Sequence, residues 1–193
     1  YQPKILLGLT ATPERMDGLS VTSYFSHRIA AEIRLPEAID RKLLSPFQYF
    51  GVSDTIDLDG LKWSYGGYDR NELSNLYTLS GAEAEKRVDN IIQAILRYVT
   101  DMEDVKGLGF CVTIDHAQYM ADQFNIKGIR SISLTSQSST EERNIAKMRL
   151  VSGEVRFIFV VDIYNEGVDI PEINQVLLIR PTQSSIIFIQ QLG

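Results

Sequence analysis

The stretch that decides the fold covers residues 107–113 and reads Gly-Leu-Gly-Phe-Cys-Val-Thr. A short apolar run of this kind is typical of a strand that is buried on both faces of a parallel sheet. Apolar residues follow it at helical spacing, namely Ala117, Met120, Ala121 and Phe124. A buried strand that leads into an amphipathic helix is the repeating unit of α/β proteins.

The same alternation extends outward from this stretch. Before it, the spacing of Ser80 and Glu83 predicts a capping box, in which each side chain bonds a free amide at a helix start. That helix carries apolar residues on one face as far as Val99. After residues 107–113, Ser139 and Glu142 predict a second capping box. The remaining predictions are strands at 129–134, 155–161 and 174–179, a helix at 139–150 and a helix from 184.

The first 80 residues are less regular. Apolar runs predict short strands at residues 4–9 and 28–33, and Leu35-Pro36 begins another turn or helix. Residues 53–80 carry scattered Asp and Gly, so they predict a connector with one short helix near Arg70–Tyr77. Strands that alternate with helices predict a parallel sheet with helices on both faces.

Composition limits the classes of protein that fit. With 193 residues and 44% apolar content, the chain can bury the core of one full domain and part of another. The net charge of −6 argues against a basic protein that coats nucleic acid. One cysteine excludes an internal disulfide framework and a cysteine-ligated zinc site. No apolar run approaches the roughly 18 residues of a membrane span, so we expect a cytoplasmic protein without membrane or metal sites.

Four segments, in this order, resemble motifs of superfamily-2 helicases and translocases. They are Leu-Thr-Ala-Thr-Pro-Glu-Arg at 9–15 (motif III), Phe-Cys-Val-Thr at 110–113 with His-Ala at 116–117 (motif IV), Asn-Glu-Gly-Val-Asp-Ile-Pro at 165–171 (motif V) and Gln-Gln-Leu-Gly at 190–193 (the opening of motif VI). Leu-Thr-Ser at 134–136 and Glu-Arg at 142–143 also fit the family pattern. Thr-Ala-Thr-Pro is closer to the restriction-enzyme-type, DNA-directed members than to the RNA-directed DEAD-box group.

The resemblance implies a motor of two RecA-like domains, with ATP and Mg²⁺ in the cleft between them. It implies that residues 1–45 are a remnant of RecA-like domain 1, residues 46–80 a connector, and residues 81–193 a RecA-like domain 2 truncated in motif VI. The full-length protein would then be an ATP-dependent helicase. This chain has neither a Walker A nor a Walker B motif, which hold the phosphates and the Mg²⁺, so we expect it to be inactive alone and to contain no catalytic residue.

The resemblance places the ATP-binding residues in motifs V and VI. It assigns them to Gly167, Asp169, Gln190 and Gly193. Glycine lets the backbone approach a ligand, and a carboxylate can accept a hydrogen bond from a ribose hydroxyl. For Gly167 and Asp169 the alternative is a glycine turn capped by Asp169, with the rigid Pro171 after it. For Gln190 and Gly193 the alternative is an ordinary amphipathic helix.

Motif III implies a coupling site between the two domains. Its residues are Thr10, Thr12 and Arg15, because small hydroxyls at a strand end can bridge groups across a cleft that closes. The alternative is a strand-to-helix turn in which Thr10 or Thr12 is the N-cap.

The resemblance also implies a nucleic-acid interface, with DNA more strongly indicated than RNA. Its candidate phosphate contacts are Thr113, Thr135, Ser136 and Asn165, because hydroxyls and amides at helix starts bind phosphate without net positive charge. The alternative for Thr113 is that it only caps its helix. Many relatives have threonine where this chain has Val161, which removes one hydroxyl contact.

Several other residues have a packing interpretation. His116 has no acid, base or metal partner in the sequence, so we expect it to pack in the core, as does Cys111. Trp63, Tyr65 and Tyr68 could stack on bases, but aromatic side chains in a connector more often pack on the domain.

Two partners and one alternative function complete the sequence-based hypothesis. The missing RecA-like domain 1 is the first partner. Self-association is the second, because the apolar run at 4–9 would be an unpaired strand unless it packs on domain 2 or on another copy. The alternative function is a RecA-like module that binds nucleic acid or protein without ATP turnover. An unrelated dinucleotide-binding protein fits poorly, because Leu-Thr-Ala-Thr at 9–12 is not a glycine-rich loop.

Overall fold

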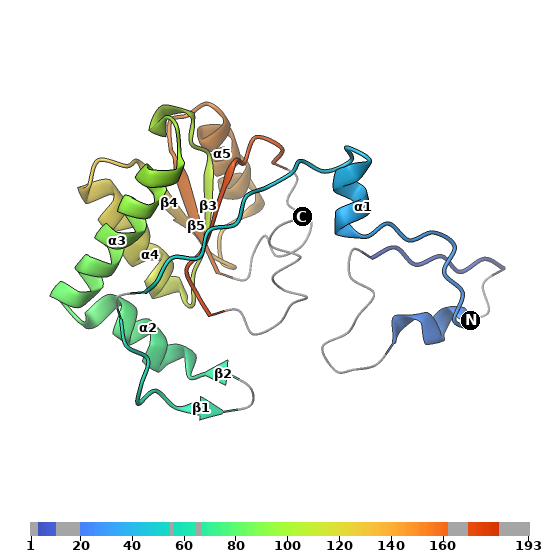
Figure 1. Ribbon diagram of the computed structural model, residues 1–193, viewed down its shortest axis with the longest axis horizontal. Helices are drawn as coiled ribbons and strands as arrows, with labels where there is room; N and C mark the ends of the chain where they lie inside the picture. Colours follow the sequence, from blue (N-terminus) through green and yellow to red (C-terminus); the bar gives the residue numbers. More distant parts are fainter. Residues whose placement is uncertain (1–3, 11–19, 55, 65–66, 162–169, 182–193) are drawn as a thin grey trace. The chain divides into compact units, whose positions relative to one another are not determined.

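The structure is a computed structural model that describes residues 4–10, 20–54, 56–64, 67–161 and 170–181 (Figure 1). The chain divides into two compact units. The smaller is built mainly from residues 1–51, and the larger comprises residues 52–183. Each unit is described by itself.

The smaller unit has a 3₁₀ helix at Val21–Phe25 and a short α-helix, α1, at Leu35–Asp40. Pro36 lies in the first turn of α1, where its missing N–H is not needed. The strands predicted at 4–9 and 28–33 are wrong: neither forms, and Ile5 and Leu9 are 86% and 90% exposed. A parallel-sheet strand is stable only beside neighbouring strands, and the described residues place none against these runs.

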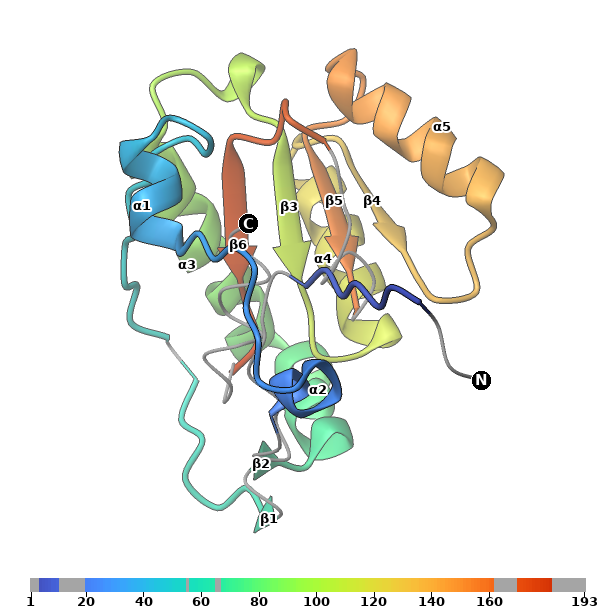
Figure 2. The same ribbon diagram turned by 90° about the vertical axis from the view of Figure 1, so that its right-hand side faces the viewer.

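The larger unit is built on one four-stranded sheet. Its strands are β3 (Gly107–Phe110), β4 (Ser131–Leu134), β5 (Phe157–Val160) and β6 (Gln175–Leu178). The strand order is β4-β5-β3-β6, and every neighbouring pair is parallel (Figure 2). The predicted strands are therefore confirmed, each two or three residues shorter than its apolar run.

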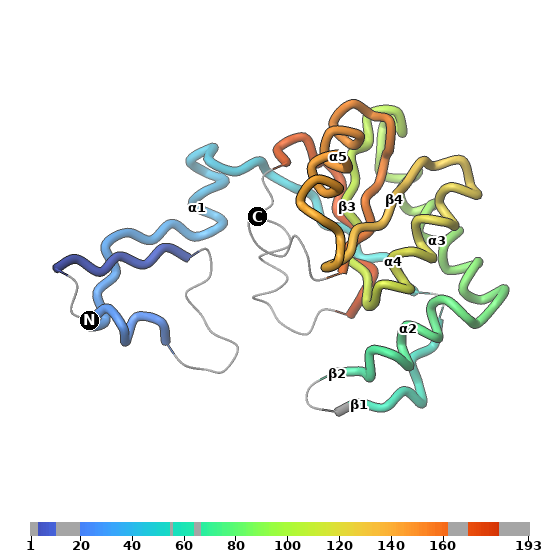
Figure 3. The backbone as a smooth tube through the Cα atoms, turned by 180° about the vertical axis from the view of Figure 1, so that it is seen from behind, coloured from blue at the N-terminus to red at the C-terminus, as the bar shows by residue number. Residues whose placement is uncertain are grey.

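Helices cover both faces of this sheet. One face packs against α3 (Ala82–Tyr98) and α4 (Ile114–Ile126), and the other packs against α5 (Thr140–Val151). The first layer includes Val88, Ile92, Ile95, Met120, Phe124, Phe157 and Phe159. The second includes Leu108, Phe110, Leu134, Ala146, Leu150, Ile158 and Val160. The predicted α/β class, a parallel sheet with helices on both faces, is confirmed, and Figure 3 shows it from behind.

The two capping boxes have opposite outcomes. Ser139 accepts a hydrogen bond from the Glu142 amide while the Glu142 carboxylate accepts one from the Ser139 amide, as predicted. The Ser80 prediction is wrong, because Gly81 is the N-cap of α3, with φ of 60°. Ser80 instead donates to the carbonyl of Leu76 in the preceding helix. Only Ser80 and Gly81 separate α2 from α3, and Ser80 is the C-cap of α2.

The segment before α3 is part of the larger unit. It contains a two-stranded antiparallel ribbon, β1 (Trp63–Ser64) and β2 (Gly67–Tyr68), and the helix α2 (Arg70–Leu79), which confirms the short predicted helix. A third apolar cluster joins Ile56, Leu73, Tyr77 and Val112. A short 3₁₀ helix at Met102–Asp104 connects α3 to β3. The division into domain remnant, connector and second domain stays a prediction.

Glycine in β3 is required by the aromatic side chains of β5. A methyl group at Gly109 would collide with the ring of Phe159, its partner across the ladder. We expect Gly109→Ala to lower the free energy of unfolding by about 1–3 kcal/mol, because it overpacks a filled core. Urea denaturation measures the loss. Gly51→Ala is the control, since no heavy atom lies within 4 Å of its added methyl; equal losses in both variants would contradict this explanation.

Candidate functional site

The candidate site is the carboxyl edge of the sheet. Because the four strands are parallel, their carboxyl ends meet at one edge. β3 leads to Thr113, and β4 leads to Thr135 and Ser136, with β5 between the two strands. The structure therefore brings three of the predicted nucleic-acid contacts to one edge of the sheet.

Most other predicted site residues lie outside the described residues. These are Thr12, Arg15, Asn165, Gly167, Asp169, Gln190 and Gly193. Of these, Asn165, Gly167 and Asp169 belong to residues 162–169, which follow β5, one of the two central strands of the sheet. Thr10 is described, and it is exposed in the smaller unit. The ATP-binding and coupling assignments therefore stay predictions.

Thr113 is the N-cap of α4. Its hydroxyl oxygen accepts a hydrogen bond from the His116 amide at 3.2 Å. The same hydroxyl shares a hydrogen bond with the hydroxyl of Ser74, which lies on α2. Thr113 therefore caps its helix, and its role as a phosphate contact stays a prediction. A phosphate at this position would meet a hydroxyl whose orientation is already set by α2 and α4.

The backbone just before Thr113 is held from two sides. The Arg70 guanidinium donates to the carbonyl of Val112 at 2.6 Å, and the Val112 amide donates to Nδ1 of His116 at 3.2 Å. Both backbone groups of Val112 are thus bonded to side chains from α2 and α4. This turn is fixed before any ligand arrives, which favours precise contacts.

The loop after β4 is closed by its own hydroxyl groups. The amide of Thr135 donates to the Ser138 hydroxyl at 3.0 Å, and the Thr135 hydroxyl accepts from the Gln137 amide at 3.2 Å. Arg143 of α5 donates to the carbonyl of Ser136 at 3.2 Å. Ser136 itself is exposed. The loop exposes the Ser136 side chain, while the Arg143 guanidinium bonds the Ser136 carbonyl.

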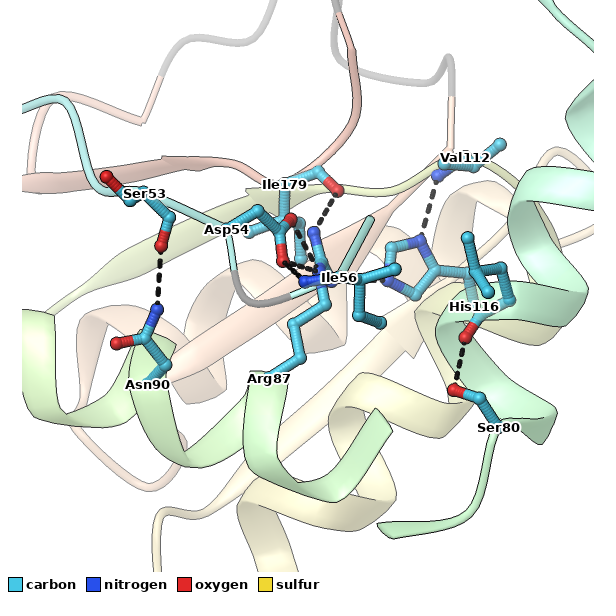
Figure 4. Close-up of polar contacts among 10 residues, drawn as sticks. Ser53, Asp54, Ile56, Ser80, Arg87, Asn90, Val112, His116 and Ile179 are labelled. Atoms are coloured by element: carbon cyan, nitrogen blue, oxygen red, sulfur yellow. Dashed lines mark hydrogen bonds and ion pairs between the residues drawn. The ribbon is translucent and has the colours of Figure 1, made fainter. Parts of the chain in front are cut away.

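Arg87 of α3 is the most connected side chain behind this edge, although it is only 4% exposed. Its Nε donates to both oxygens of Asp54, at 2.8 and 3.1 Å, and its Nη2 donates to the carbonyl of Ile179 at 3.1 Å (Figure 4). Its Cζ lies 3.8 Å from the centre of the Tyr77 ring, a cation–π contact. One guanidinium thus joins α3 to α2, to the end of β6 and to the segment before β1.

His116 is neutral in the core beside Arg87. Because its Nδ1 accepts from Val112, the ring carries its proton on Nε2, which lies 3.5 Å from Nη1 of Arg87. Two donors that face each other form a close approach rather than a hydrogen bond. Burial lowers the pKa of His116 to about 3, and the charge of Arg87 adds to this lowering. The histidine therefore acts as a fixed acceptor for Val112.

The core interpretations of His116 and Cys111 are confirmed, since both are fully buried. Burial raises the pKa of the Cys111 thiol far above its ordinary value. The expected packing of the aromatic residues is only partly confirmed. Tyr68 packs against the cluster around Tyr77, whereas Trp63 is 58% exposed, edge-on to Tyr68. Tyr65 lies outside the described residues.

Sequence reasoning did not identify Arg87 or Arg70 as part of the site. Arg87 carried a signal, since it falls between Ala84 and Val88 on the apolar face of its helix. Arg70 carried none, because its partner Val112 is 42 residues away. Among the described residues, no three His, Cys, Asp or Glu side chains gather into a metal site, and no helix is long and apolar enough to cross a membrane.

Residues 86–193 match the model of a protein family described as the helicase conserved C-terminal domain. A 51.5 kDa protein of a Lactococcus phage is 26% identical over 185 residues, covering 96% of this chain and 38% of the relative. IRC3 of Saccharomyces cerevisiae is 28% identical over 189 residues, covering 97% and 26%. The ATP-dependent RNA helicase SrmB of Haemophilus influenzae is 22% identical over 175 residues, covering 87% and 38%. The chain therefore spans well under half the length of these relatives.

Two solved structures are similar to part of this chain. The Hef helicase domain of Pyrococcus furiosus is 23% identical and covers 55% of this chain and 22% of its own, with a TM-score of 0.43. The C-terminal domain of the SWI2/SNF2 ATPase of Sulfolobus solfataricus is 17% identical and covers 55% and 50%, with a TM-score of 0.45.

The neutral state of His116 predicts a specific pH dependence. The pKa is about 3 in the folded chain against an ordinary 6.5, so the unfolded chain binds the extra proton between these values. This contribution to stability is complete above pH 6.5 and is lost as the pH falls toward 3. Between pH 7.5 and 5.5 we expect the wild-type chain to lose about 1 kcal/mol more unfolding free energy than His116→Gln.

Urea denaturation at the two pH values measures this difference. His27→Gln is the matched control, because His27 is exposed in the smaller unit, and it should keep the wild-type pH dependence. An identical pH dependence in the wild-type and His116→Gln chains would contradict a neutral, buried His116.

Proposed function

Because this chain belongs to the helicase conserved C-terminal domain family, we propose that it is the C-terminal motor portion of an ATP-dependent superfamily-2 helicase or translocase. The observation that carries this proposal is the family match over residues 86–193, which is more than half of the chain. The parallel sheet, with its loops gathered at one carboxyl edge, supports it. The relative named as an ATP-dependent RNA helicase supports the dependence on ATP.

In this proposal the nucleotide site is shared between two domains. Residues 81–193 form RecA-like domain 2, residues 1–45 are the last part of domain 1, and residues 46–80 connect them. Hydrolysis of ATP, with Mg²⁺, supplies the energy for opening and closing the cleft. Gly167 and Asp169 hold the nucleotide from domain 2.

Motifs III and VI complete this proposed arrangement. Gln190 and Gly193 begin the second segment at the nucleotide. Thr10, Thr12 and Arg15 couple the closing of the cleft to domain 2. The phosphate loop and the Mg²⁺ ligands come from the rest of domain 1, so this chain is inactive without it.

The nucleic acid binds at the carboxyl edge of the sheet in this proposal. Thr113, Thr135, Ser136 and Asn165 contact phosphates through hydroxyl, amide and backbone N–H groups. Such contacts do not depend on net charge, so a charge of −6 does not oppose them. The two described loops support this role, because α2 and α4 fix Thr113 and α5 fixes the loop of Ser136. The Thr-Ala-Thr-Pro sequence of motif III favours DNA as the polymer.

The test is ATP hydrolysis by the intact protein that contains this chain. We expect single-stranded DNA to stimulate turnover, and RNA of the same length to stimulate it less. Asp169→Ala should slow the stimulated rate at least about tenfold, because a ribose or cleft contact of a carboxylate stabilises the closed state by about 1.4 kcal/mol or more.

Asp122→Ala is the matched control, since Asp122 is exposed on α4 and bonds only to its helix neighbour Gln118 among the described contacts. It should leave the rate unchanged. Binding of DNA without any stimulated turnover would contradict the motor and favour the alternative, a binding module. Equal or stronger stimulation by RNA would contradict the choice of polymer.

A further inference from the structure

The chain passes from the smaller unit into the larger one at Val52. We call residues 52–54 and 56–58 the lead-in segment. Movement of the chain before Val52 can reach the larger unit along this segment, because the two are covalently continuous. The attachments of this segment therefore determine which parts of the larger unit such a movement can displace.

Polar and apolar contacts hold the described part of the lead-in segment. The Ser53 carbonyl accepts a hydrogen bond from Asn90 at 3.0 Å, and Ile56 is buried in the cluster with Leu73 and Tyr77. Between these points, Asp54 accepts both bonds from Nε of Arg87 and also a bond from the Ile56 amide at 3.2 Å. The backbone around Asp54 is exposed, so the ion pair with Arg87 is its central attachment.

Arg87 also bonds the carboxyl edge of the sheet. Its Nη2 bonds the carbonyl of Ile179, directly after β6, while the Ile179 amide donates to the carbonyl of Phe110 at the end of β3. Its guanidinium also lies over Tyr77 of α2, the helix whose Ser74 bonds Thr113. Arg87 therefore links the lead-in segment to the end of β6 (Figure 4). Through Tyr77 and Ser74 of α2 it is also connected to the turn at Thr113.

An arginine in this position is not explained by stability alone. Position 87 lies on the buried face of α3, beside Ala84 and Val88, where an apolar side chain would pack without loss of hydration. Buried ion pairs contribute little net stability compared with apolar replacements, because removing two charges from water offsets their attraction. The directional bonds of the guanidinium to three separate segments are what an apolar side chain would not supply.

We propose that Arg87 is the positioning residue that fastens the lead-in segment to the carboxyl edge of the sheet, so that movement of the preceding domain is transmitted to Thr113 and to the chain after β6. The transmission rests on the proposed motor function, whereas the fastening does not. Arg87 contacts no nucleotide or nucleic acid in this account, and it acts through the segments that it joins.

The experiment compares three variants of the intact protein. Arg87→Met removes the guanidinium and keeps an apolar side chain of similar length. Asp54→Ala removes the exposed partner and keeps the core, so it tests the transmission through the turnover ratio if Arg87→Met does not fold. Arg156→Met is the matched control, since Arg156 is a buried arginine bound to Glu103 at the opposite, amino edge of the sheet.

The first measurement is hydrogen exchange of the lead-in amides. We expect the Ile56 amide to exchange at least about tenfold faster in Arg87→Met, because this variant keeps the Asp54 acceptor of that amide but loses the charge-assisted bonds that close the segment. Arg156→Met should leave that exchange unchanged. Unchanged exchange in Arg87→Met would overturn the fastening.

The second measurement is the ratio of nucleic-acid-stimulated to basal ATP turnover. We expect this ratio to fall at least about fivefold in Arg87→Met and Asp54→Ala but not in Arg156→Met, because only the first two detach the segment that transmits movement. An unchanged ratio despite faster exchange, or an equal fall in Arg156→Met, would overturn the transmission. Wild-type protein without any stimulation would instead refute the proposed function, and the exchange data would still decide the fastening.

Discussion

The buried guanidinium of Arg87 is the interaction on which the arrangement of the larger unit depends. It bonds a carboxylate 33 residues before it and a carbonyl 92 residues after it, and it stacks on a tyrosine of the adjoining helix. A buried cation must have its donors satisfied, so these partners cannot drift apart without a large cost in free energy. Burial, together with the charge of Arg87, keeps the neighbouring His116 neutral, and as a neutral acceptor it holds the backbone of Val112.

The parallel sheet gives this cluster its position. Four parallel strands bring the ends of β3, β4, β5 and β6 to one edge, and Arg87 reaches that edge through Ile179. The same edge carries Thr113, fixed by α2 and α4, and Ser136, fixed over Arg143 of α5. Membership in the helicase C-terminal family gives these fixed hydroxyl groups a proposed role, as contacts to a phosphate backbone.

The sequence predicted the features that local physics determines. The spacing of apolar residues and the helix-capping patterns identified the alternation of strands and helices. Ser139 and Glu142 form the expected capping box. Prediction failed where residues distant in the sequence determine the local structure. Residues 4–9 are apolar enough for a strand but have no neighbouring strand in the described structure. Ser80 bonds the carbonyl of Leu76 in the preceding helix and does not cap the next one. Arg87 was visible as a charge on an apolar helix face, but its partners depend on the tertiary fold.

The most direct test of this account is a double-mutant cycle on Arg87→Met and Asp54→Ala, with unfolding free energies measured in urea. If the ion pair joins the lead-in segment to the core, the two substitutions together should cost at least about 1 kcal/mol less than the sum of their separate effects. Additive effects, within about 0.5 kcal/mol, would show that Asp54 and Arg87 act independently and would contradict the account.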